Sequence, residues 1–381
     1  MKLLTRLSTY NSATNSFLAT GISAAESPTE KDSLPVPTRV GTIARGVELG
    51  SGGTVVGNAP SWRRTWLLAG FLWFAVSFPL GAVHEPEHPR LPNLDARIAA
   101  KPVTVGQSNA VVNLRARLPQ AAVQFDLLTG SPKLILARDG FLSGKNGLGR
   151  GVSAAAVRAF APGDPLLPTK AFLQEHRGLF GHGPEALGAA RITRDYVAKH
   201  NRLHTVIWQQ QVDGIPVHEG VLMAHTTAKG ELVNLASRFL ADPVRAANNG
   251  TSNRAALLAN PGITPRQAIA LAAAAVGETV TATAVMAVEA RSSGAEKYQR
   301  FRHPRLPGET HARLVWLPLN GTALRLCWDI VLTSKQRGEM FRLLVDAASG
   351  KVHVRQGLTE YISDATYRVS VASGCCDRCL S

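Results

Sequence analysis

The chain has 381 residues, of which 45% are apolar, and this composition is that of a folded protein with room for two or three domains. Its 42 Lys and Arg residues outnumber 27 Asp and Glu residues, so the formal net charge is +15. The basic residues are scattered, without a Lys/Arg-rich block or a nucleic-acid-binding motif. We therefore expect a diffusely basic surface and no nucleic-acid partner.

The first 83 residues predict export. Residues 1–60 are rich in Ser, Thr and Gly without a hydrophobic period, which indicates a disordered region or a wrongly assigned start. In residues 61–83, Arg63 and Arg64 precede an apolar run of about 18 residues, a length at which a cleaved signal peptide and a membrane anchor are both consistent with the sequence. Either alternative predicts an exported protein, extracellular or periplasmic.

A literal H-E-x-x-H follows, formed by His84, Glu85 and His88. In zinc peptidases this motif works only on a helix, where both imidazoles project from one face. Pro86 stands inside the motif and Pro89 directly after it, and an interior proline costs a helix about 3 kcal/mol. We interpret the match as chance, assign no catalytic, metal or cofactor residue, and predict a proline-rich linker over 84–109. A zinc peptidase that uses His84 and His88 is the disfavoured alternative.

The next segments predict a hairpin, a loop and a helix. Residues 121–137 alternate apolar side chains on both sides of TGSP, with Gly130 and Pro132 in the connection. The glycine-rich stretch 140–151 lacks the pattern of a phosphate-binding loop. Residues 164–181 have helical spacing and end on a glycine C-cap. Within that helix we expect His176 at the surface or boundary, because it has no metal-ligand partner at i+4.

Three strands follow, over HTVIWQQQV, VHEGVLMAHT and ELVNLASRFL, joined by the turns DGIP and AKG. His218-Glu219 lacks a histidine at i+4, so it is no better a zinc motif than the first. A second helix, residues 263–277, has Thr264 as N-cap, Pro265 at its first position and Gly277 beyond its end. Further strands lead to the hairpin turn VDAASGKV, which Asp346 and Gly350 close. Trp316, Cys327 and Trp328 are expected in the core of this sheet.

The order of helix and three-stranded meander resembles the fungalysin/thermolysin propeptide (FTP) domain of secreted zinc metallopeptidases. The residues that match its pattern are Gln209, Gln210, Gly214, Pro216, Val217, Gly220, His225 and Gly230. The helix and sheet of the second half resemble the PepSY-like part of the same propeptides. ISDATYRVSVAS, residues 362–373, is similar to the junction with the catalytic domain, but the sequence then ends in GCCDRCLS. We therefore expect a truncated proenzyme or a free-standing propeptide, and in Cys375, Cys376 and Cys379 a tail without a metal site.

The resemblance implies an α+β fold of two consecutive modules, each a helix packed on an antiparallel sheet of cystatin/PepSY-like type. It places an FTP-like domain over 110–245, a linker over 246–260, a PepSY-like domain over 261–360 and a truncated junction over 361–381. It also implies a non-catalytic protein without a cofactor, which inhibits the catalytic domain of a zinc metallopeptidase or assists its folding, in trans or formerly in cis. A cell-envelope binding module is the alternative function.

Overall fold

The computed structural model describes residues 89–97 and 103–360. The predicted disordered start, the apolar segment 61–83, the match at His84, Glu85 and His88, and the junction and cysteine-rich tail over 361–381 lie outside these residues. Within them, no helix is long and apolar enough to cross a membrane. The fold is α+β: helices pack on a sheet whose strands are almost all antiparallel.

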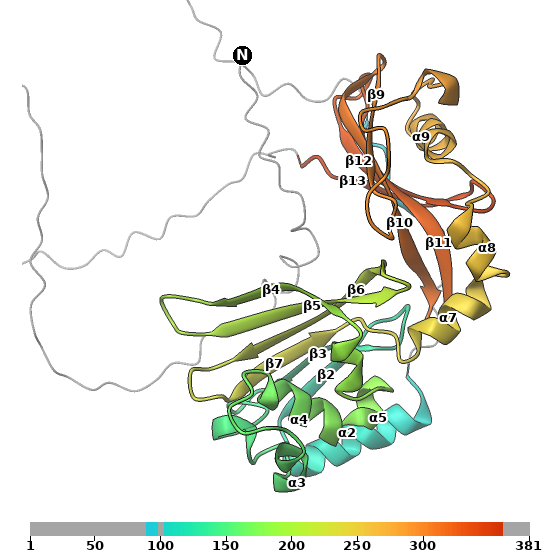
Figure 1. The fold of residues 1–381 in the computed structure, drawn as a ribbon. Coiled ribbons are helices and arrows are strands. Elements are labelled where there is room, and N and C mark those ends of the chain that lie inside the picture. The colour runs from blue at the N-terminus through green and yellow to red at the C-terminus, as the bar shows by residue number, and fades with distance from the viewer. Residues whose placement is uncertain (1–88, 98–102, 361–381) are drawn as a thin grey trace, which may run out of the picture. The chain divides into compact units, whose positions relative to one another are not determined.

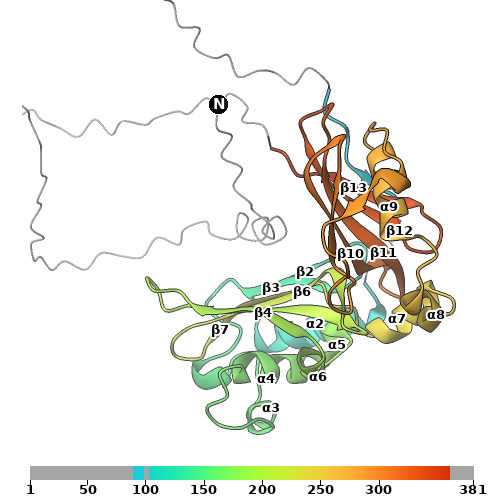
Figure 2. The same ribbon diagram turned by 45° about the horizontal axis from the view of Figure 1, so that its top comes forward.

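In the first half, helices cover one face of a twisted antiparallel sheet (Figure 1, Figure 2). The helices are α2 (Val105–Arg117), α3 (Ala154–Arg158), α4 (Leu167–Glu175), α5 (Arg177–Phe180) and α6 (Glu185–Gly188), with a 3-10 turn at Lys145–Gly147. The strands are β2 (Ala121–Phe125), β3 (Pro132–Ala137), β4 (Arg191–Val197), β5 (His204–Val212), β6 (Ile215–Thr226) and β7 (Leu232–Ser237).

A hydrophobic core holds these helices on the sheet. Leu114 of α2, Phe172 of α4 and Trp208 of β5 are all at most 1% exposed and belong to one cluster with Ile135 and Leu235. Removing a large aliphatic or aromatic side chain of this kind from water stabilises the fold by about 1.5–3 kcal/mol. The apolar residues of α2, α4, β3, β5 and β7 that meet in this cluster therefore hold the helices on this face.

The second half repeats the helix-on-sheet arrangement with other elements. Its helices are α7 (Pro243–Gly250), α8 (Arg254–Ala259) and α9 (Pro265–Ala274), with a 3-10 turn at Ala282–Ala284. Its strands are β1 (Leu94–Asp95), β8 (Met286–Ala287), β9 (Gln299–His303), β10 (Leu306–Asn320), β11 (Ala323–Thr333), β12 (Met340–Asp346) and β13 (Val352–Gly357). Trp316 and Trp328 are buried in its core, as is Cys327 on the opposite face of the sheet, which confirms their expected place.

One parallel bridge joins the strands of the two halves: Val217 of β6 pairs with Trp316 of β10. The indole N–H of Trp316 also donates to the main-chain oxygen of Val212 at 3.1 Å. Val212, Ile215 and Val217 pack in the core of the second half, although the predicted boundary near residue 245 assigns them to the first. The end of the β5–β6 hairpin is therefore shared by both cores.

Three predicted elements are confirmed. β2 and β3 form the hairpin, β5, β6 and β7 form the antiparallel meander, and α9 begins with a capping box in which Thr264 accepts from the Gln267 amide. The predicted helix over 164–181 is interrupted between α4 and α5, at His176. His176 is 7% exposed and its Nε2 lies 2.8 Å from the Gly151 oxygen, so the expectation of a surface or boundary position was wrong.

Both predicted linkers contain regular structure. Within 84–109, β1 pairs with β13 and α2 begins at Val105, after the N-cap Thr104. The 246–260 segment holds the end of α7 and all of α8. The prolines of 84–109 predict a linker, and β1 cannot be recognised among them because a two-residue strand is too short to show a hydrophobic period. The helices of the 246–260 segment are short. Such helices form only with tertiary contacts, here those of Ala246 and Ala247 with the core.

Candidate functional site

A bulge interrupts β6 where it pairs with β5, and two polar residues, His218 and Glu219, lie in it. Gln209 pairs with Val221 and Gln211 with Pro216, so the four residues 217–220 oppose Gln210 alone. We call residues 217–220 the β6 bulge. Bulges re-aim side chains and disturb the regular ladder, and here the re-aimed residues are His218 and Glu219.

The side chain of Gln209 closes the bulge from the neighbouring strand. Its Nε2 donates to the main-chain oxygens of Val217 at 2.6 Å and of Gly220 at 3.0 Å, and lies 3.2 Å from that of Gln210. Gln209 is 5% exposed, so these bonds satisfy main-chain carbonyls that the interrupted ladder does not. The bulge is therefore a fixed feature of the hairpin.

Two backbone features at the end of the bulge, at Gly220 and Glu219, also fix its conformation. A Cβ at Gly220 would lie 2.9 Å from the Cβ and Cγ1 of Val217, closer than such atoms approach. Glu219 has a φ of 57°, the left-handed region in which a side chain is strained. Strain of this kind costs about 1–3 kcal/mol and persists where the surrounding structure holds it.

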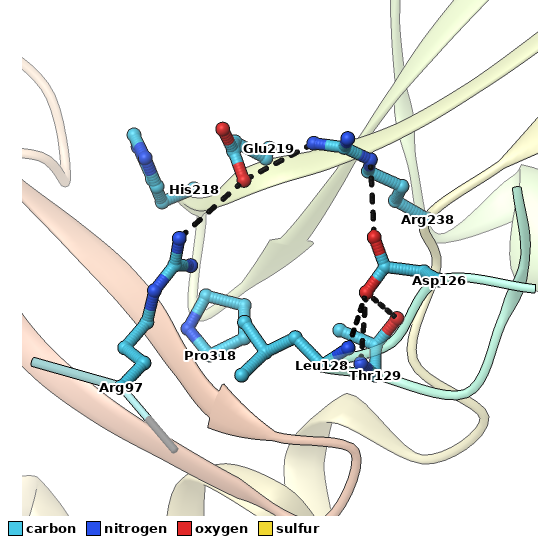
Figure 3. A pocket seen from close by; sticks show the side chains of 8 residues that line it. All are labelled: Arg97, Asp126, Leu128, Thr129, His218, Glu219, Arg238 and Pro318. Carbon is cyan, nitrogen blue, oxygen red and sulfur yellow. Dashed lines mark hydrogen bonds and ion pairs between the residues drawn. The ribbon is translucent and has the colours of Figure 1, made fainter. Parts of the chain in front are cut away.

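The bulge forms one wall of a cavity of about 270 Å³. Figure 3 shows the lining side chains in a ring, with Glu219 opposite the turn between β2 and β3 and with Arg97 and Arg238 on either side. We call this cavity the bulge pocket. Its lining residues are Arg97, Asp126, Leu128, Thr129, His218, Glu219, Arg238 and Pro318.

Ion pairs connect the charged members of the ring. Oε2 of Glu219 lies 3.1 Å from Nη1 of Arg238 and 3.8 Å from Nη2 of Arg97. Arg238 also lies 3.5 Å, through Nε, from Oδ2 of Asp126. The other oxygen of Asp126 accepts from the amides of Leu128 and Thr129 at 3.0 and 2.9 Å. Each carboxylate is thus held in place, and the Thr129 hydroxyl donates to Asp126 as well.

Arg97 reaches the pocket from the segment that precedes α2. The main chain before it is held on β13, where the amide of Ala96 donates to the His353 oxygen at 2.8 Å. Its guanidinium forms a two-pronged bond with Asp95, from Nε to Oδ1 at 2.8 Å and from Nη2 to Oδ2 at 2.7 Å. The side chain is 9% exposed. Its Nη1 is buried and has no hydrogen-bond partner among the described residues.

His218 lies beside Glu219 in the ring and interacts electrostatically with Asp329 and Arg342 of the second half. Burial lowers its pKa, although Glu219 and Asp329 favour its charged form. Asp329 is 3% exposed and forms ion pairs with Arg313 and Arg342, each at 3.1 Å. Burial alone would raise the pKa of Asp329, but these two arginines produce a net downward shift. The imidazole is therefore neutral at neutral pH, beside an aspartate that stays charged.

The other residues that match the propeptide pattern lie outside the pocket and have structural contacts. Gln210 bonds both the N–H and the C=O of Leu240, each at 2.9 Å, and Nδ1 of His225 lies 2.8 Å from the Thr205 hydroxyl. Gly214 follows Asp213 in the β5–β6 turn, where both have positive φ, at 74° and 54°. Pro216 is buried beside Gln211, and the Gly230 oxygen accepts from the Gly147 amide.

Asp346 and Gly350 close their predicted turn. Oδ1 of Asp346 accepts from the amides of Ala348 and Ser349 at 2.9 and 2.8 Å, and Gly350 has a φ of 77°. The other carboxylate oxygen bonds Arg325 at 3.0 Å and His353 at 3.3 Å. Burial would raise the pKa of Asp346, but the bonds from His353, Ser349 and Ala348 hold it well below its ordinary value.

The charged side chains that line the bulge pocket are paired with one another. Both of its carboxylates hold arginines, and its hydroxyl, on Thr129, donates to the Asp126 carboxylate. Among residues 89–97 and 103–360, no group of three or more His, Cys, Asp or Glu side chains is placed to hold a metal. The pocket offers fixed donors and a small hollow.

Sequence reasoning singled out Gln209, Val217 and Gly220 but not the residues they expose. In the sequence, His218 and Glu219 stand out only as an incomplete zinc motif, and Arg97, Asp126 and Arg238 belong to no motif. A pair of polar residues inside a run of strand residues, directly before a glycine, is the signal that indicates such a bulge. No pattern in the sequence connects Arg97 to Glu219, because 122 positions separate them.

Comparison with protein-family models finds no match for this chain, and comparison with curated proteins finds none. Among solved structures, it is similar to the Bacillus megaterium YpeB C-terminal domain, with 12% sequence identity and a TM-score of 0.25. The similarity covers 68% of this chain and 100% of that one. A similarity of this size carries no inference about function.

Proposed function

We propose that the chain is a non-catalytic, propeptide-type protein that binds the catalytic domain of a secreted zinc metallopeptidase, inhibits it and assists its folding. The partner domain acts in trans, or was once part of the same chain. The proposal includes export, because the apolar segment 61–83 predicts it.

One observation carries the proposal. The resemblance to the FTP domain rests in part on Gln209, Gly214, Val217 and Gly220. These residues lie in a single hairpin and together form its turn and the β6 bulge. Gly214 makes its turn, Gln209 bonds the bulge, and Gly220 leaves room for Val217. Residues that depend on each other in this way support a shared structural motif better than scattered identities do.

The fold suits such a function. An exposed sheet edge and a large surface can cover a partner's cleft without reactive groups, since affinity in such interfaces comes from area, anchors and complementarity. β4 is exposed along all seven of its residues, and among the described strands it pairs only with β5. It includes Ile192, Tyr196 and Val197, which are 45–50% exposed. An edge of this kind is able to pair with an extended segment of a partner.

The experiment is a refolding assay. The catalytic domain of a fungalysin-family zinc metallopeptidase is produced without its own propeptide, unfolded in guanidinium chloride, and diluted with and without the full chain. We expect a higher yield of refolded peptidase, seen as hydrolysis after the chain is removed, and inhibition of the folded peptidase by added chain. Serum albumin at equal concentration is the control for crowding. If neither yield nor inhibition differs from the albumin control, the proposal is wrong.

A further inference from the structure

The strongest feature without a role in the fold is Nη1 of Arg97. The Arg97 side chain is more than nine-tenths buried, its Nε and Nη2 bond Asp95, and Nη1 has no hydrogen-bond partner among the residues that the structure describes. Figure 3 shows this guanidinium in the ring of lining side chains, between His218 and Pro318. A buried charged donor without an acceptor is costly, so such a group marks a place where an acceptor binds.

The charges around the pocket decide what kind of acceptor fits. Among the lining residues, Arg97 and Arg238 give two positive charges and Asp126 and Glu219 give two negative ones, so their formal sum is zero. Asp95, outside the lining, also pairs with Arg97. His218 adds nothing at neutral pH, because burial lowers its pKa. A phosphate or carboxylate would thus meet guanidinium groups whose charge is already balanced by carboxylates, and would approach the Glu219 carboxylate. A neutral oxygen takes the donor without that repulsion.

The size and the lining of the pocket further restrict the class of ligand that fits it. A cavity of about 270 Å³ is smaller than the usual range for drug-sized ligands and accommodates one or two residues of a chain. Leu128 and Pro318 supply apolar wall, and Leu127, which precedes Leu128 in the chain, is 68% exposed. An extended polypeptide presents this combination: neutral carbonyl oxygens at regular intervals, with apolar side chains between them.

We propose that the bulge pocket binds a main-chain carbonyl of an extended polypeptide segment, with Arg97 Nη1 as the donor and Leu127, Leu128 and Pro318 in contact with the segment's side chains. The strained backbone at Glu219 serves this site, because the ion pairs of Glu219 with Arg97 and Arg238 hold both guanidinium groups in the ring. The inference goes beyond the proposed function, since it assigns a ligand class to the pocket whichever polypeptide supplies the segment.

The test is a titration of the full chain, labelled with 15N, followed by NMR. The probe is N-acetylglycine N-methylamide, a neutral mimic of one peptide unit, and the comparison probes are acetate and inorganic phosphate. We expect saturable shifts of the Leu128, Thr129 and Glu219 amide signals with the amide probe, with a Kd on the order of millimolar, and weaker binding of both anions.

Two variants test whether Arg97 is the donor to the bound amide. Arg97→Met keeps the apolar stem and removes the guanidinium, and we expect it to weaken amide binding by roughly tenfold, the loss of one charged hydrogen bond. Arg150→Met, which removes a surface arginine paired with Asp139, is the matched control and should bind as the unmodified chain does. The unmodified chain alone still decides the question if Arg97→Met does not fold.

Two outcomes overturn the inference. Absence of saturable shifts with the amide would mean that Nη1 meets only water, and tighter binding of acetate or phosphate would make the pocket an anion site. Because the probe contains no peptidase, neither outcome bears on the refolding assay, and a failed refolding assay leaves this titration intact.

Discussion

Gln209 and Gly220 lie on paired strands, and Nε2 of Gln209 donates to the main-chain oxygen of Gly220 across the β6 bulge at 3.0 Å. The same amide bonds Val217 on the other side of the bulge. The contact therefore determines whether His218 and Glu219 face the bulge pocket, although neither Gln209 nor Gly220 lines that pocket.

Gln209→Ala should destabilise the protein by about 2–4 kcal/mol, because buried carbonyls of the bulge lose their donor. We also expect weaker amide binding at the bulge pocket, since Glu219 is no longer held. Urea denaturation at pH 7 measures the first effect. Gln211→Ala is the matched control on the same strand, at a partly buried position, and should cost less than about 1 kcal/mol. Equal losses for the two variants would contradict the role given to Gln209.

Gly220→Ala tests the close packing inside the bulge. The added methyl group would lie 2.9 Å from Val217 Cβ, so either residue must move, at a cost of about 1–3 kcal/mol. Gly188→Ala is the control, because nothing lies within 4 Å of a Cβ at that helical position. There the substitution should be neutral or slightly stabilising. Thermal unfolding of both variants gives the comparison, and a Gly220→Ala protein as stable as the Gly188→Ala protein would contradict it.

Asp346→Asn should reduce stability in a pH-dependent way. The folded state holds the pKa of Asp346 below its unfolded value of about 3.9, so its ionised form stabilises the fold above that pH. This contribution is lost as pH falls below the unfolded value toward the folded one. We expect the variant to be about 1–3 kcal/mol less stable at pH 7, and the difference to shrink as pH falls below about 4.

Urea midpoints from pH 7 to pH 3 test this, with Asp139→Asn, which alters an exposed ion pair with Arg150, as the control. A stability difference between Asp346→Asn and the unmodified chain that stays constant over this range would show that the lost contribution is not ionic.

His182→Phe should flatten the pH dependence of stability on the acid side of neutrality. Burial lowers the pKa of His182, so the unfolded state binds more protons and stability falls as pH drops below the unfolded pKa of about 6.5. The ring packs between Phe180 and Phe239, at centroid distances of 5.6 and 5.9 Å. Its Nε2 is buried without a hydrogen-bond partner among the described residues.

A phenylalanine at position 182 keeps the aromatic contacts and removes the group that titrates. The variant also loses the contact of Nδ1 with the Gly183 oxygen at 3.1 Å. We therefore expect a smaller fall in stability between pH 7.5 and pH 5 than in the unmodified chain, measured by thermal unfolding at both values. The exposed His200→Phe serves as the control. A steeper loss of stability at pH 5 in His182→Phe than in the unmodified chain would be the opposite of this expectation.

The sequence by itself determined the elements with local signals. The β5–β6 turn follows from Asp213 and Gly214, which adopt positive φ readily, and α9 begins where Thr264, Pro265 and Gln267 form a capping box. Several strands, β3 among them, alternate buried apolar residues with residues that are less buried. These signals lie within a few residues of one another, so they can be recognised without knowledge of the rest of the chain.

Only the tertiary structure determines which residues meet in the bulge pocket. Arg97, Asp126, Glu219 and Arg238 come from four separate segments, and the ion pairs that join them depend on how those segments pack. β1 has no recognisable pattern of its own and is a strand only because β13 supplies its hydrogen bonds. The physical reason is the range of the interactions: turns and caps are local, whereas charge pairing and burial join residues that are distant in the sequence.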